Sequence, residues 1–534
     1  MLSDLLISLR LGFKCLLIVL VPYILAVIIY RLTWHPLAKY PGPLLGRITD
    51  WYIVIHSLVG DRHIRLLELH DTYGPVVRFG PNRLSINTIE GLQKIYGIKA
   101  STRKSSYYSV FSDIFSGENS LATIDSAAHS KKKKVISQAL SDSAISRMEE
   151  VVLRNIRKFT ERLGENDSKD EEAWGPPKNM KEWASYLAFD VMGDVCFSHS
   201  FGMLERNDYR YLLDTLSEGT NGLNIGGWMP GLFRFKIGYL LFRKVAEGLK
   251  SYQEFSIQQS ERRLQLKDQT SKADVYSYML EANRRAISEG GQAIFNPHDL
   301  VGESSLLIIA GSDTTAITIT VVTFYLLHNP AAYEKLVGEI RSRFSNVEEI
   351  RGGPALNSCH WLRACIEEGM RMSPPMPGML PREVVAPGLR IGDNFFPEGV
   401  ELAVTHYAMH HNEEYYPDSF AYKPERWISN AYERETKEES ERRLHLAQSA
   451  FCAFSIGSRG CVGKGLALKE VSIALARIIW MYDMRLAPGT ENHGAGGAGM
   501  GRGRHRAHEQ QITDMFVSKV DGPIVQFRKR AADR

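Results

Sequence analysis

The hydrophobic pattern begins with an apolar run long enough to cross a membrane. Residues Leu11–Tyr30 carry a single charge, on Lys14. Twenty helical residues span about 30 Å, which is the thickness of a bilayer's hydrocarbon core. Arg31 and Trp34 follow as a basic and aromatic edge, and no small-residue cleavage site is present, which argues against a cleaved signal peptide. We therefore expect a single-pass membrane anchor over residues 1–31.

A proline-rich segment follows the apolar run. Residues 32–46 contain Pro36, Pro41 and Pro43. Proline fixes φ and ends a helix, so we expect a stiff hinge that leads out of the membrane. The rest of the chain, residues 47–534, is expected to form one folded body on this stalk.

Beyond the hinge, helical periodicity dominates and strand-like runs are confined to two regions. The first lies around the turn Gly80-Pro81-Asn82, between Val76 and Asn87, and the second between Arg382 and Val404. Helical periodicity is clearest over Met148–Leu163, Trp183–Cys196, Tyr239–Leu266 and Ala331–Phe344. The predicted fold class is therefore mainly α with a small β-sheet subdomain, preceded by one transmembrane helix.

Composition refines this picture mostly by exclusion. The 534 residues are 44% hydrophobic and 24% charged, which excludes intrinsic disorder and a collagen-like fibre. A formal net charge of +4 is too small for an electrostatic nucleic-acid binder, so no nucleic-acid partner is expected. Six scattered cysteines without a CxxC pair exclude a disulfide scaffold and a zinc ribbon. The glycine-rich stretch at 494–506 is expected to be a flexible, solvated surface insertion, with a basic contact loop as the rival interpretation.

One cysteine stands in a setting that favours metal ligation. Cys461 lies in FSIGSRGCVG, residues 454–463, just before a helical run over Leu466–Tyr482. The helix N-terminus and the neighbouring Arg459 are expected to lower the pKa of the thiol, and the thiolate is the form that binds metal. Glycines also let backbone N–H groups approach the sulfur. Cys461 is thus the predicted metal ligand, and the other cysteines are predicted buried hydrophobes.

A second long apolar segment carries an acid beside an alcohol. Asn296 is a suitable N-cap and Pro297 a suitable first residue, and the helix should end near Asn329 after about 33 residues. A second membrane span would place Asp313 near the bilayer centre at a cost of about 3 kcal/mol. We therefore expect a buried helix with Asp313 and Thr314 side by side near its middle.

These motifs resemble the signature of the cytochrome P-450 haem-thiolate monooxygenases. The pattern Phe-x-x-Gly-x-Arg-x-Cys-x-Gly is filled at every defining position, and Glu368-x-x-Arg371 and Pro-Glu-Arg426-Trp precede it in the family's order. The anchor and hinge look like those of the microsomal type, particularly fungal enzymes of specialised (secondary) metabolism. The resemblance extends from the hinge to Phe527. It implies the cytochrome P-450 fold and a haem, iron protoporphyrin IX, whose axial ligand is the Cys461 thiolate.

The resemblance also implies roles for the acid–alcohol pair and for a buried ion-pair network. Asp313 and Thr314 would deliver protons during dioxygen activation while bulk water stays out. Glu368, Arg371 and Arg426 would be the structural support of the haem loop.

Cofactor contacts follow from the same resemblance. Arg382 and Arg459 match cations that hold the haem propionates, and Phe454 opens the cysteine loop. The family's Trp-x-x-x-Arg pattern is altered here to His129-Ser-Lys-Lys-Lys133. His129 and Lys133 can still donate to a carboxylate, although Lys acts as a point charge and not as a bidentate fork.

The implied partners are a reductase, a membrane and a hydrophobic substrate. No flavin-binding region is appended, so NADPH-derived electrons would come from a separate NADPH–cytochrome reductase, with dioxygen as the other co-substrate. The remainder of the basic run Lys131–Lys134 would dock this donor through complementary charge. The expected location is the endoplasmic reticulum membrane, with the catalytic domain in the cytosol.

The expected substrate is a hydrophobic small molecule. It would be a fungal secondary-metabolite intermediate that is hydroxylated, or oxidatively coupled or cyclised. Aromatic, branched and thioether side chains in the family's substrate-contact segments favour an apolar, adaptable pocket, with core packing as the rival interpretation for each residue. The residues expected to line it are Tyr107, Tyr108, Phe111, Phe115, Ile308, Ile309, Ala310, Met376, Met379 and Leu380.

Two other function classes remain open. One is a haem-thiolate isomerase or dehydratase that uses no dioxygen, and the intact Asp313–Thr314 pair argues against it. The other is a non-catalytic haem-binding membrane protein, against which the retained Cys461 argues.

Overall fold

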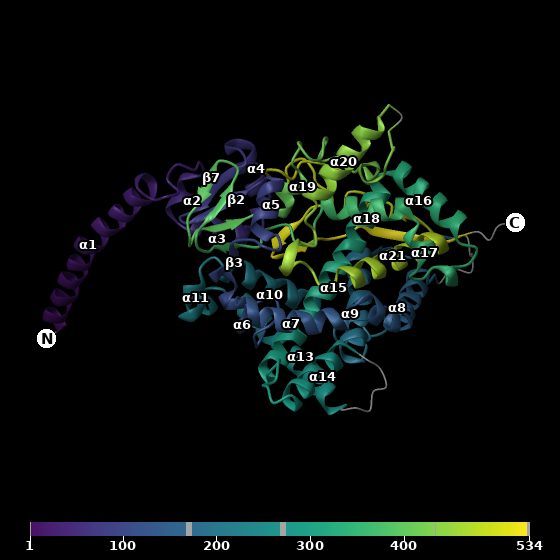
Figure 1. Cartoon of the computed structure of the whole chain (residues 1–534), viewed down its shortest axis with the longest axis horizontal. Coiled ribbons are helices and arrows are strands. Elements are labelled where there is room, and N and C mark those ends of the chain that lie inside the picture. Colours follow the sequence, from purple (N-terminus) through teal and green to yellow (C-terminus); the bar gives the residue numbers. More distant parts are fainter. Residues whose placement is uncertain (1, 167–172, 267–273, 433, 531–534) are drawn as a thin grey trace.

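The computed structural model describes residues 2–166, 173–266, 274–432 and 434–530, and one long helix projects from the folded body (Figure 1). This helix, α1, runs over Leu2–Thr33. Its segment from Asp4 to Thr33 has a mean hydropathy of 2.5, and none of the most apolar window is buried. By length and composition α1 can cross a membrane, and it ends two residues beyond the predicted boundary.

The proline-rich hinge packs against the folded body and does not stand away from it as a stalk. Leu37 is fully buried. The ring of Tyr40 stacks on Phe396 with a centroid separation of 5.6 Å. The backbone N–H of Arg78 donates to the carbonyl of Pro41 over 2.7 Å. Stacking and hydrogen bonding thus fix the prolines onto the sheet instead of leaving them as a spacer.

The predicted strand regions form a five-stranded sheet in the order β1-β2-β8-β5-β3. Strands β2 and β8 are parallel and the other neighbours are antiparallel. The strands are β1 (Val76–Gly80), β2 (Arg83–Ile86), β3 (Thr102–Lys104), β5 (Arg382–Val384) and β8 (Glu401–Ala403). The register places Lys104 of β3 opposite Arg382 of β5.

Smaller sheets tie distant segments together. They are β4-β12-β9, formed by Lys178–Asn179, Ile524–Lys529 and Tyr482–Leu486; β10-β11, formed by Thr513–Met515 and Val517–Lys519; and β6-β7, formed by Leu389–Ile391 and Asn394–Phe396.

Helices make up most of the described body, which confirms the predicted fold class. Before the long central helix come α2 (Leu44–Ile48), α3 (Trp51–Val59), α4 (Arg62–Tyr73), α5 (Ile89–Tyr96), α6 (Phe111–Ile114), α7 (Ser126–Ala139), α8 (Asp142–Leu163), α9 (Met180–Phe197), α10 (Leu212–Gly226), α11 (Pro230–Arg234), α12 (Ile237–Leu241), α13 (Arg243–Gln265) and α14 (Val275–Ser288). From it onward come α15 (Pro297–His328), α16 (Pro330–Arg343), α17 (Pro354–Asn357), α18 (His360–Met372), α19 (His406–His410), α20 (Lys437–Ala450) and α21 (Lys464–Met481).

One stretch that was predicted as a single helix forms two helices. The run Tyr239–Leu266 is divided into α12 and α13 at Phe242, whose φ of −120° and ψ of 61° are not helical. The ring of Phe242 stacks on Phe233 of α11, with centroids 6.4 Å apart. This packing bends the chain where periodicity alone predicts that it continues. The helices predicted over Met148–Leu163, Trp183–Cys196 and Ala331–Phe344 are confirmed with extended or shifted ends as α8, α9 and α16.

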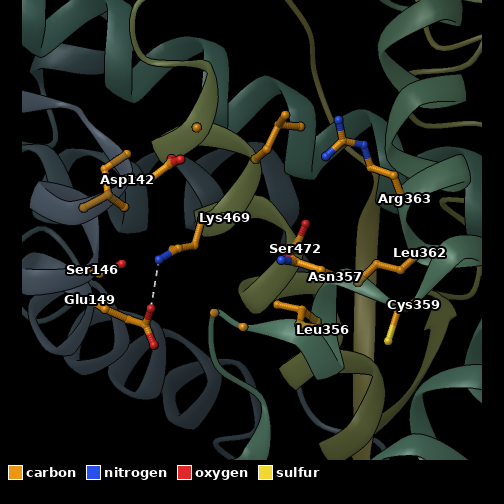
Figure 2. Close-up of a pocket in the computed structure, with 15 residues that line it drawn as sticks. Asp142, Ser146, Glu149, Leu356, Asn357, Cys359, Leu362, Arg363, Lys469 and Ser472 are labelled. Atoms are coloured by element: carbon orange, nitrogen blue, oxygen red, sulfur yellow. Dashed lines mark hydrogen bonds and ion pairs between the residues drawn. The ribbon is translucent and has the colours of Figure 1, made fainter. Parts of the chain in front are cut away.

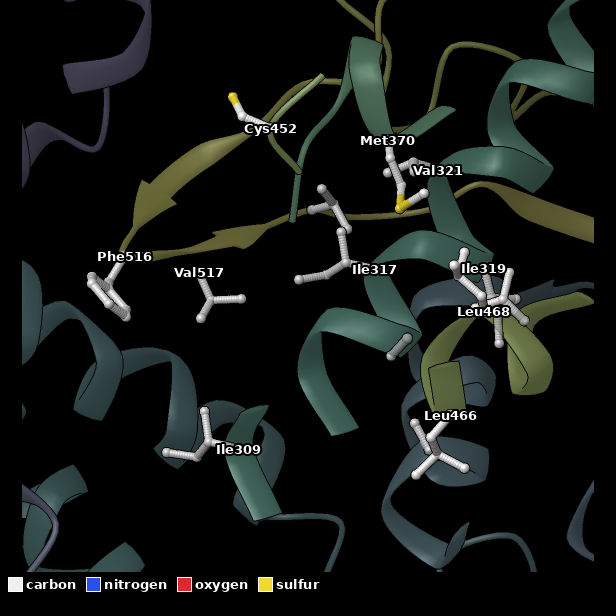
Figure 3. Packing of buried hydrophobic residues seen from close by; sticks show 14 of the residues in the cluster. Ile309, Ile317, Ile319, Val321, Met370, Cys452, Leu466, Leu468, Phe516 and Val517 are labelled. Carbon is white, nitrogen blue, oxygen red and sulfur yellow. The ribbon is translucent and has the colours of Figure 1, made fainter. Parts of the chain in front are cut away.

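The central helix α15 begins and ends as its sequence predicts. Asn296 and Asp299 form a reciprocal capping box, with Pro297 in the first turn. The most apolar window of α15 is 72% buried, which identifies a core helix although its length would suit a membrane span. Helix α9 packs along it, and an apolar layer that includes Ile319 of α15 and Leu468 of α21 joins it to α21 (Figure 3).

The glycine-rich insertion is a surface loop, but the expectation that it cannot pack is wrong. Ala495 is 3% exposed and forms a bridge with Gln510. The guanidinium of Arg506 lies 3.3 Å from the centroid of the Phe420 ring. Arg502 forms an ion pair with Glu68 of α4 at 2.6 Å. Arginine side chains therefore supply the contacts that the glycines lack.

Candidate active site

A cavity of about 280 Å³ brings most of the predicted site residues together. It lies among α7, α15, α21, the cysteine loop and the turn between β10 and β11. The predicted residues that line it are Cys461, Phe454, Arg459, His129, Lys133, Thr314, Phe115, Ile309, Ala310, Met376 and Leu380. Arg382 and Asp313 are absent from its wall and lie behind it.

Five of the residues predicted to contact the substrate lie outside this wall. Tyr107, Tyr108, Phe111, Ile308 and Met379 are buried but do not line the cavity. The first three form an aromatic layer behind the wall, where they contact one another and Trp228 or Phe516. Sequence reasoning missed lining residues on other elements, namely Leu121, Leu223, Phe516 and Val517. Their spacing carries no signal, because folding alone brings the β10–β11 turn over the cavity.

The cysteine loop is held in one conformation by close backbone contacts. The Cys461 N–H donates to the Phe454 carbonyl over 2.9 Å. Gly457 has a φ of +71°, and a Cβ there would lie 2.0 Å from the Tyr96 carbonyl, so only glycine fits. Lys133 of α7 donates to the carbonyls of Ser458 and Gly460 at 2.6 and 3.2 Å. Lys133 thus fastens the loop, a role that the sequence did not predict.

The Cys461 side chain opens into the cavity, and its pKa is set by opposing effects. Burial raises the pKa of the thiol, whereas N–H groups of Gly463 and Lys464 and the Lys133 ammonium lower it. Burial prevails, so the predicted lowering of the pKa is wrong for the chain alone. The Arg459 guanidinium donates to the carbonyls of Thr123 and Ile124 at 2.7 and 3.0 Å.

A buried ion-pair network supports this loop, with the three residues that the resemblance implied. Both oxygens of Glu368 accept from Arg371, at 2.8 and 2.9 Å, and both side chains are fully buried. Arg426 donates to Glu368 over 3.3 Å. Burial alone would raise the pKa of Glu368, but the two guanidinium groups outweigh it and lower the pKa. The carboxylate therefore stays charged inside the protein.

The network reaches the cysteine loop through one histidine. Arg371 donates to the carbonyl of His410 over 2.7 Å. The Nε2 atom of His410 accepts from the Cys452 N–H over 3.0 Å, just before the loop begins. Burial lowers the pKa of His410 far below its usual value, so the ring is neutral and has a lone pair for this bond. His410 was not predicted from the sequence.

On the other side of the cavity, α15 presents the predicted alcohol but turns the acid away. Thr314 lines the cavity and donates to the Ala310 carbonyl over 2.7 Å. Asp313 instead accepts from Lys181 of α9 over 3.1 Å, with both side chains less than one-fifth exposed. Gly311 permits this packing, because a Cβ there would lie 2.3 Å from Met192 Sδ of α9.

Basic groups gather at one end of the cavity; within the described part of the chain Lys104, Arg382 and Arg459 form no ion pair, although Asp125 acts on Arg459. Lys104 lines the wall, is 4% exposed and faces Arg382 across the sheet. Burial, with Arg382 and Arg459 nearby, lowers its pKa well below the usual value. Burial and the same cations lower the pKa of His129 to about 3. Lys104 was missed from the sequence because a lone lysine beside a short strand gives no pattern.

The basic run on α7 does not form the single solvated face that a charge run predicts. Lys132 is 3% exposed, donates to the Glu118 carbonyl over 3.1 Å and pairs with Asp299 at 3.4 Å. The expectation that Lys132 docks a partner is therefore wrong. Lys131 and Lys134 are exposed.

A buried acid, Glu303, holds the segment before α7 in place. Glu303 of α15 accepts from the Ser120 N–H over 2.6 Å and from its hydroxyl over 3.0 Å. Burial raises the pKa of Glu303 to about 7; Lys132 and the Ser120 bonds oppose this rise, and Asp299 adds to it. Ser120 itself lines the cavity, so this contact positions part of its wall.

A second cavity lies between α8, the α17–α18 region and α21 (Figure 2). It measures about 570 Å³, and an ion pair between Lys469 and Glu149 crosses it at 2.9 Å. The Cys359 sulfur is at its edge, without a base beside it (Figure 2). Within the described ranges no cluster of three His, Cys, Asp or Glu side chains could hold a metal ion. The chemistry therefore concentrates in the Cys461 cavity.

Known proteins similar to this chain share one family description. The family model described as Cytochrome P450 matches residues 45–495. Cytochrome P450 monooxygenase AKT7 of Alternaria alternata is 35% identical, over 95% of this chain and 95% of its own. Cytochrome P450 monooxygenase poxM of Penicillium oxalicum is 34% identical over 96% and 94% of the two chains. Cytochrome P450 monooxygenase atnE of Emericella nidulans is 36% identical over 94% and 93%.

The raised pKa of Glu303 predicts a pH-dependent stability. Between the usual pKa of 4.5 and the folded value of about 7, the folded state binds more protons than the unfolded state, so stability falls as pH rises through this window. We expect Glu303→Gln to remove this falling contribution, so that the free energy of unfolding rises more steeply, or falls less steeply, with pH between about pH 5 and pH 8 than in the wild type. Denaturant unfolding of the purified protein measures it, with the exposed Glu438→Gln as control. Equal slopes for wild type and Glu303→Gln would contradict the assignment.

Proposed function

The chain belongs to the cytochrome P450 family, whose matched relatives are named monooxygenases, and from this premise we propose a membrane-anchored haem-thiolate monooxygenase. Its substrate is a hydrophobic small molecule, an intermediate of fungal secondary metabolism, and its electrons come from NADPH through a separate reductase. The observation that carries the proposal is the cavity in which the Cys461 thiol faces Thr314 of α15.

The residues around the cavity fit a haem. Cys461 supplies the soft thiol ligand. The N–H groups of Gly463 and Lys464 would stabilise the negative charge of its thiolate. Lys104 and Arg459 line the wall at the cationic end, with Arg382 close behind. Buried cations without an acidic partner are costly, and a dianionic group such as the two propionates would balance them. When bound, a thiolate-ligated haem supplies the activation of dioxygen and the oxidation of the substrate.

Thr314 and Asp313 have different roles in proton transfer. The Thr314 hydroxyl faces the cavity and can pass a proton to a group bound above Cys461. Asp313 lies on the α9 side, where it is paired with the Lys181 ammonium. To deliver a proton to Thr314, the Asp313 carboxyl group must first leave Lys181 and take up a proton from solvent. We propose that the exchange of this ion pair connects Thr314 to protons from outside.

The walls of the cavity support an apolar substrate. Phe115, Leu223, Ile309 and Phe516 are among the aromatic and branched side chains that line the cavity. Met376 adds an adaptable thioether. We propose hydroxylation, or oxidative coupling or ring formation, of a molecule held by these contacts.

Membrane attachment is supported by more than α1. Large apolar side chains are exposed on α3, such as Ile55 and Val59, and around α12, where Phe235 just before the helix and Leu240 within it are about three-quarters exposed. In Figure 1 these elements lie at the end of the body from which α1 leaves. We propose that this end rests on the endoplasmic reticulum membrane, with the body in the cytosol.

The reductase site is proposed for the exposed side of α7. Lys131 and Lys134 are exposed there, while Lys133 of the same helix donates to the cysteine loop. A negatively charged donor attracted to them would lie close to Cys461.

Replacing Lys104 should weaken haem binding without weakening the haem-free fold. A charge-assisted hydrogen bond to a propionate is worth about 1.5 kcal/mol, so Lys104→Met should speed haem transfer to apomyoglobin about tenfold. The thermal midpoint of the haem-free protein should change little, because repulsion of the buried ammonium by its neighbours offsets its contacts with the Leu121 carbonyl and the Tyr108 ring. The exposed Lys99→Met serves as control. Unchanged haem transfer, or a lower midpoint of the haem-free protein, would argue for a merely structural lysine.

The thiolate assignment is tested by a reduced carbon-monoxide difference spectrum. Membranes that contain the wild-type chain should give the strongly red-shifted Soret band of thiolate-ligated haem, and Cys461→Ser should lose it. Cys15→Ser, which changes an exposed cysteine of α1, should keep the band. A folded, haem-loaded wild type without the band would overturn the proposed function.

Thr314→Ala distinguishes a monooxygenase from a haem-thiolate isomerase. With a reductase and NADPH, product formation should fall by about tenfold or more, and the share of electrons released as peroxide should rise. Thr320→Val changes a buried threonine of the same helix whose hydroxyl bonds its own backbone, and it should leave this share unchanged. An enzyme that is indifferent to Thr314→Ala would favour chemistry without dioxygen.

A further inference from the structure

The turn between β10 and β11 has an uncommon backbone conformation. Phe516 alone joins the two strands, and its φ is +73°. A bulky residue is rarely found at a positive φ, and this value is that of the classic γ-turn, which is rare and strained. The side chains of Phe516 and Val517 line the cavity of Cys461. A strained residue persists only where its surroundings fix it, so other contacts must hold Phe516 in the cavity wall.

The carboxylate of Asp514 connects this turn to the start of α4. Its Oδ1 atom accepts from the Phe516 N–H over 3.2 Å. Its two oxygens accept from Arg62, at 2.9 Å each, and both side chains are fully buried. A bidentate pair of this kind fixes the carboxylate in position and in orientation. Arg62 therefore acts on Phe516 through Asp514.

The backbone of Asp514 connects the same turn to two further elements. Its N–H donates to the carbonyl of Gly60, the residue after α3, over 2.8 Å. Its carbonyl accepts from the fully buried Asn224 of α10 over 2.9 Å. Leu223, the neighbour of Asn224 in the chain, also lines the cavity. Two parts of the cavity wall, α10 and the β10–β11 turn, are thus bound to one residue.

The surroundings of Arg62 keep its guanidinium in one place. A Cβ at Gly378 would lie 2.0 Å from Arg62 Nη2, so the backbone there passes close to the guanidinium. Gly378 lies between Met376 and Leu380, which both line the cavity. On another side, the ring centroid of Trp228 is 5.6 Å from the Arg62 guanidinium. Arg62 is therefore packed where it can hold Asp514 but cannot swing away from it.

We propose that Arg62 and Asp514 are positioning residues that determine how bulky a ligand the cavity accepts. The pair holds Phe516 at its positive φ and keeps the ring in the wall, where its centroid is 5.4 Å from that of Phe111. Without the pair, Phe516 relaxes to a negative φ and its ring leaves the wall. The cavity then admits larger ligands. The selection of a substrate by this means rests on the proposed function, whereas the conformation of the turn does not.

Hydrogen exchange tests the turn without depending on haem. Arg62→Met together with Asp514→Leu leaves no buried charge unpaired, and such replacements of buried ion pairs are often neutral for stability. The double variant removes the acceptor of the Phe516 N–H, so the peptide that spans β10 and β11 should exchange severalfold faster, with α21 unchanged. Lys158→Met together with Glu205→Leu replaces a partly exposed ion pair and serves as control. Unchanged exchange of the β10–β11 peptide would overturn the proposal.

The binding of two azoles tests the effect on ligand size. Imidazole and N-tritylimidazole, which carries a bulky triphenylmethyl group, both bind haem iron, and the shift of the Soret band gives their dissociation constants. In the Arg62→Met, Asp514→Leu variant N-tritylimidazole should bind severalfold more tightly, whereas imidazole should stay within about twofold of wild type. Equal changes for the two azoles would indicate a merely structural ion pair and would overturn the positioning role.

A third variant shows whether the pair acts through the Phe516 ring. Phe516→Ala should change the ratio of the two dissociation constants in the same direction, and adding the Arg62 and Asp514 replacements should change it no further. Additive effects would contradict the proposed route.

Arg62→Lys keeps the proposal testable if the apolar pair does not fold. Lysine keeps the charge but cannot make the bidentate contact, so the exchange rate and the azole ratio should change in the same direction by a smaller amount. An Arg62→Lys variant that matches the wild type in both would overturn the proposal. If the wild type shows no thiolate-ligated haem, the proposed function fails, and the exchange of the β10–β11 peptide still decides the role of the pair.

Discussion

The ion pair between Glu368 and Arg371 is the interaction on which the rest of the site depends. Both side chains are fully buried, and removing either would leave an uncompensated charge at a cost of about 3–5 kcal/mol. From Arg371 the contacts run through the His410 carbonyl, and from the His410 ring to the Cys452 N–H at the start of the cysteine loop. The glycines let the loop approach a ligand closely, and the ion-pair network holds the loop in one conformation.

Buried positive charges gather at the cavity beside that loop. Lys104, Arg382 and Arg459 act on one another, and burial is the main cause that lowers the pKa of Lys104 and of Arg459. Carbonyl groups satisfy part of their hydrogen bonding, as for Arg459, but they do not neutralise charge. These buried cations therefore lower the stability of the chain alone, and a dianion bound among them would offset that cost. A substrate without charge gains nothing by approaching these cations, so we expect it to bind against the apolar side chains of the cavity.

Much of the fold and the core of the site could be predicted from the sequence because the signals were local. The capping residues of α15 and the glycine spacing of the cysteine loop are encoded within a few positions. What could not be predicted depends on contacts between distant segments. Lys104 acquires its role by pairing across the sheet with Arg382, and Asp313 turns toward α9 because Lys181 is there. Tyr107, Tyr108 and Phe111 pack behind the cavity wall, which their aromatic character alone does not reveal, while the β10–β11 turn lines the cavity.

The packed hinge would link the proposed membrane attachment to the orientation of the site. The Arg78 guanidinium of β1 donates to the Arg31 carbonyl at the end of α1 over 2.8 Å. Arg47 donates to the carbonyl of Ala38 within the hinge over 3.1 Å. These bonds hold the C-terminal end of the anchor to the same sheet that carries Lys104 and Arg382. A free stalk would let the body rotate above a bilayer, whereas this attachment limits its tilt and keeps the exposed apolar side chains of α3 on the side of the anchor. An apolar substrate dissolved in the membrane would then meet the body at the same end in every molecule.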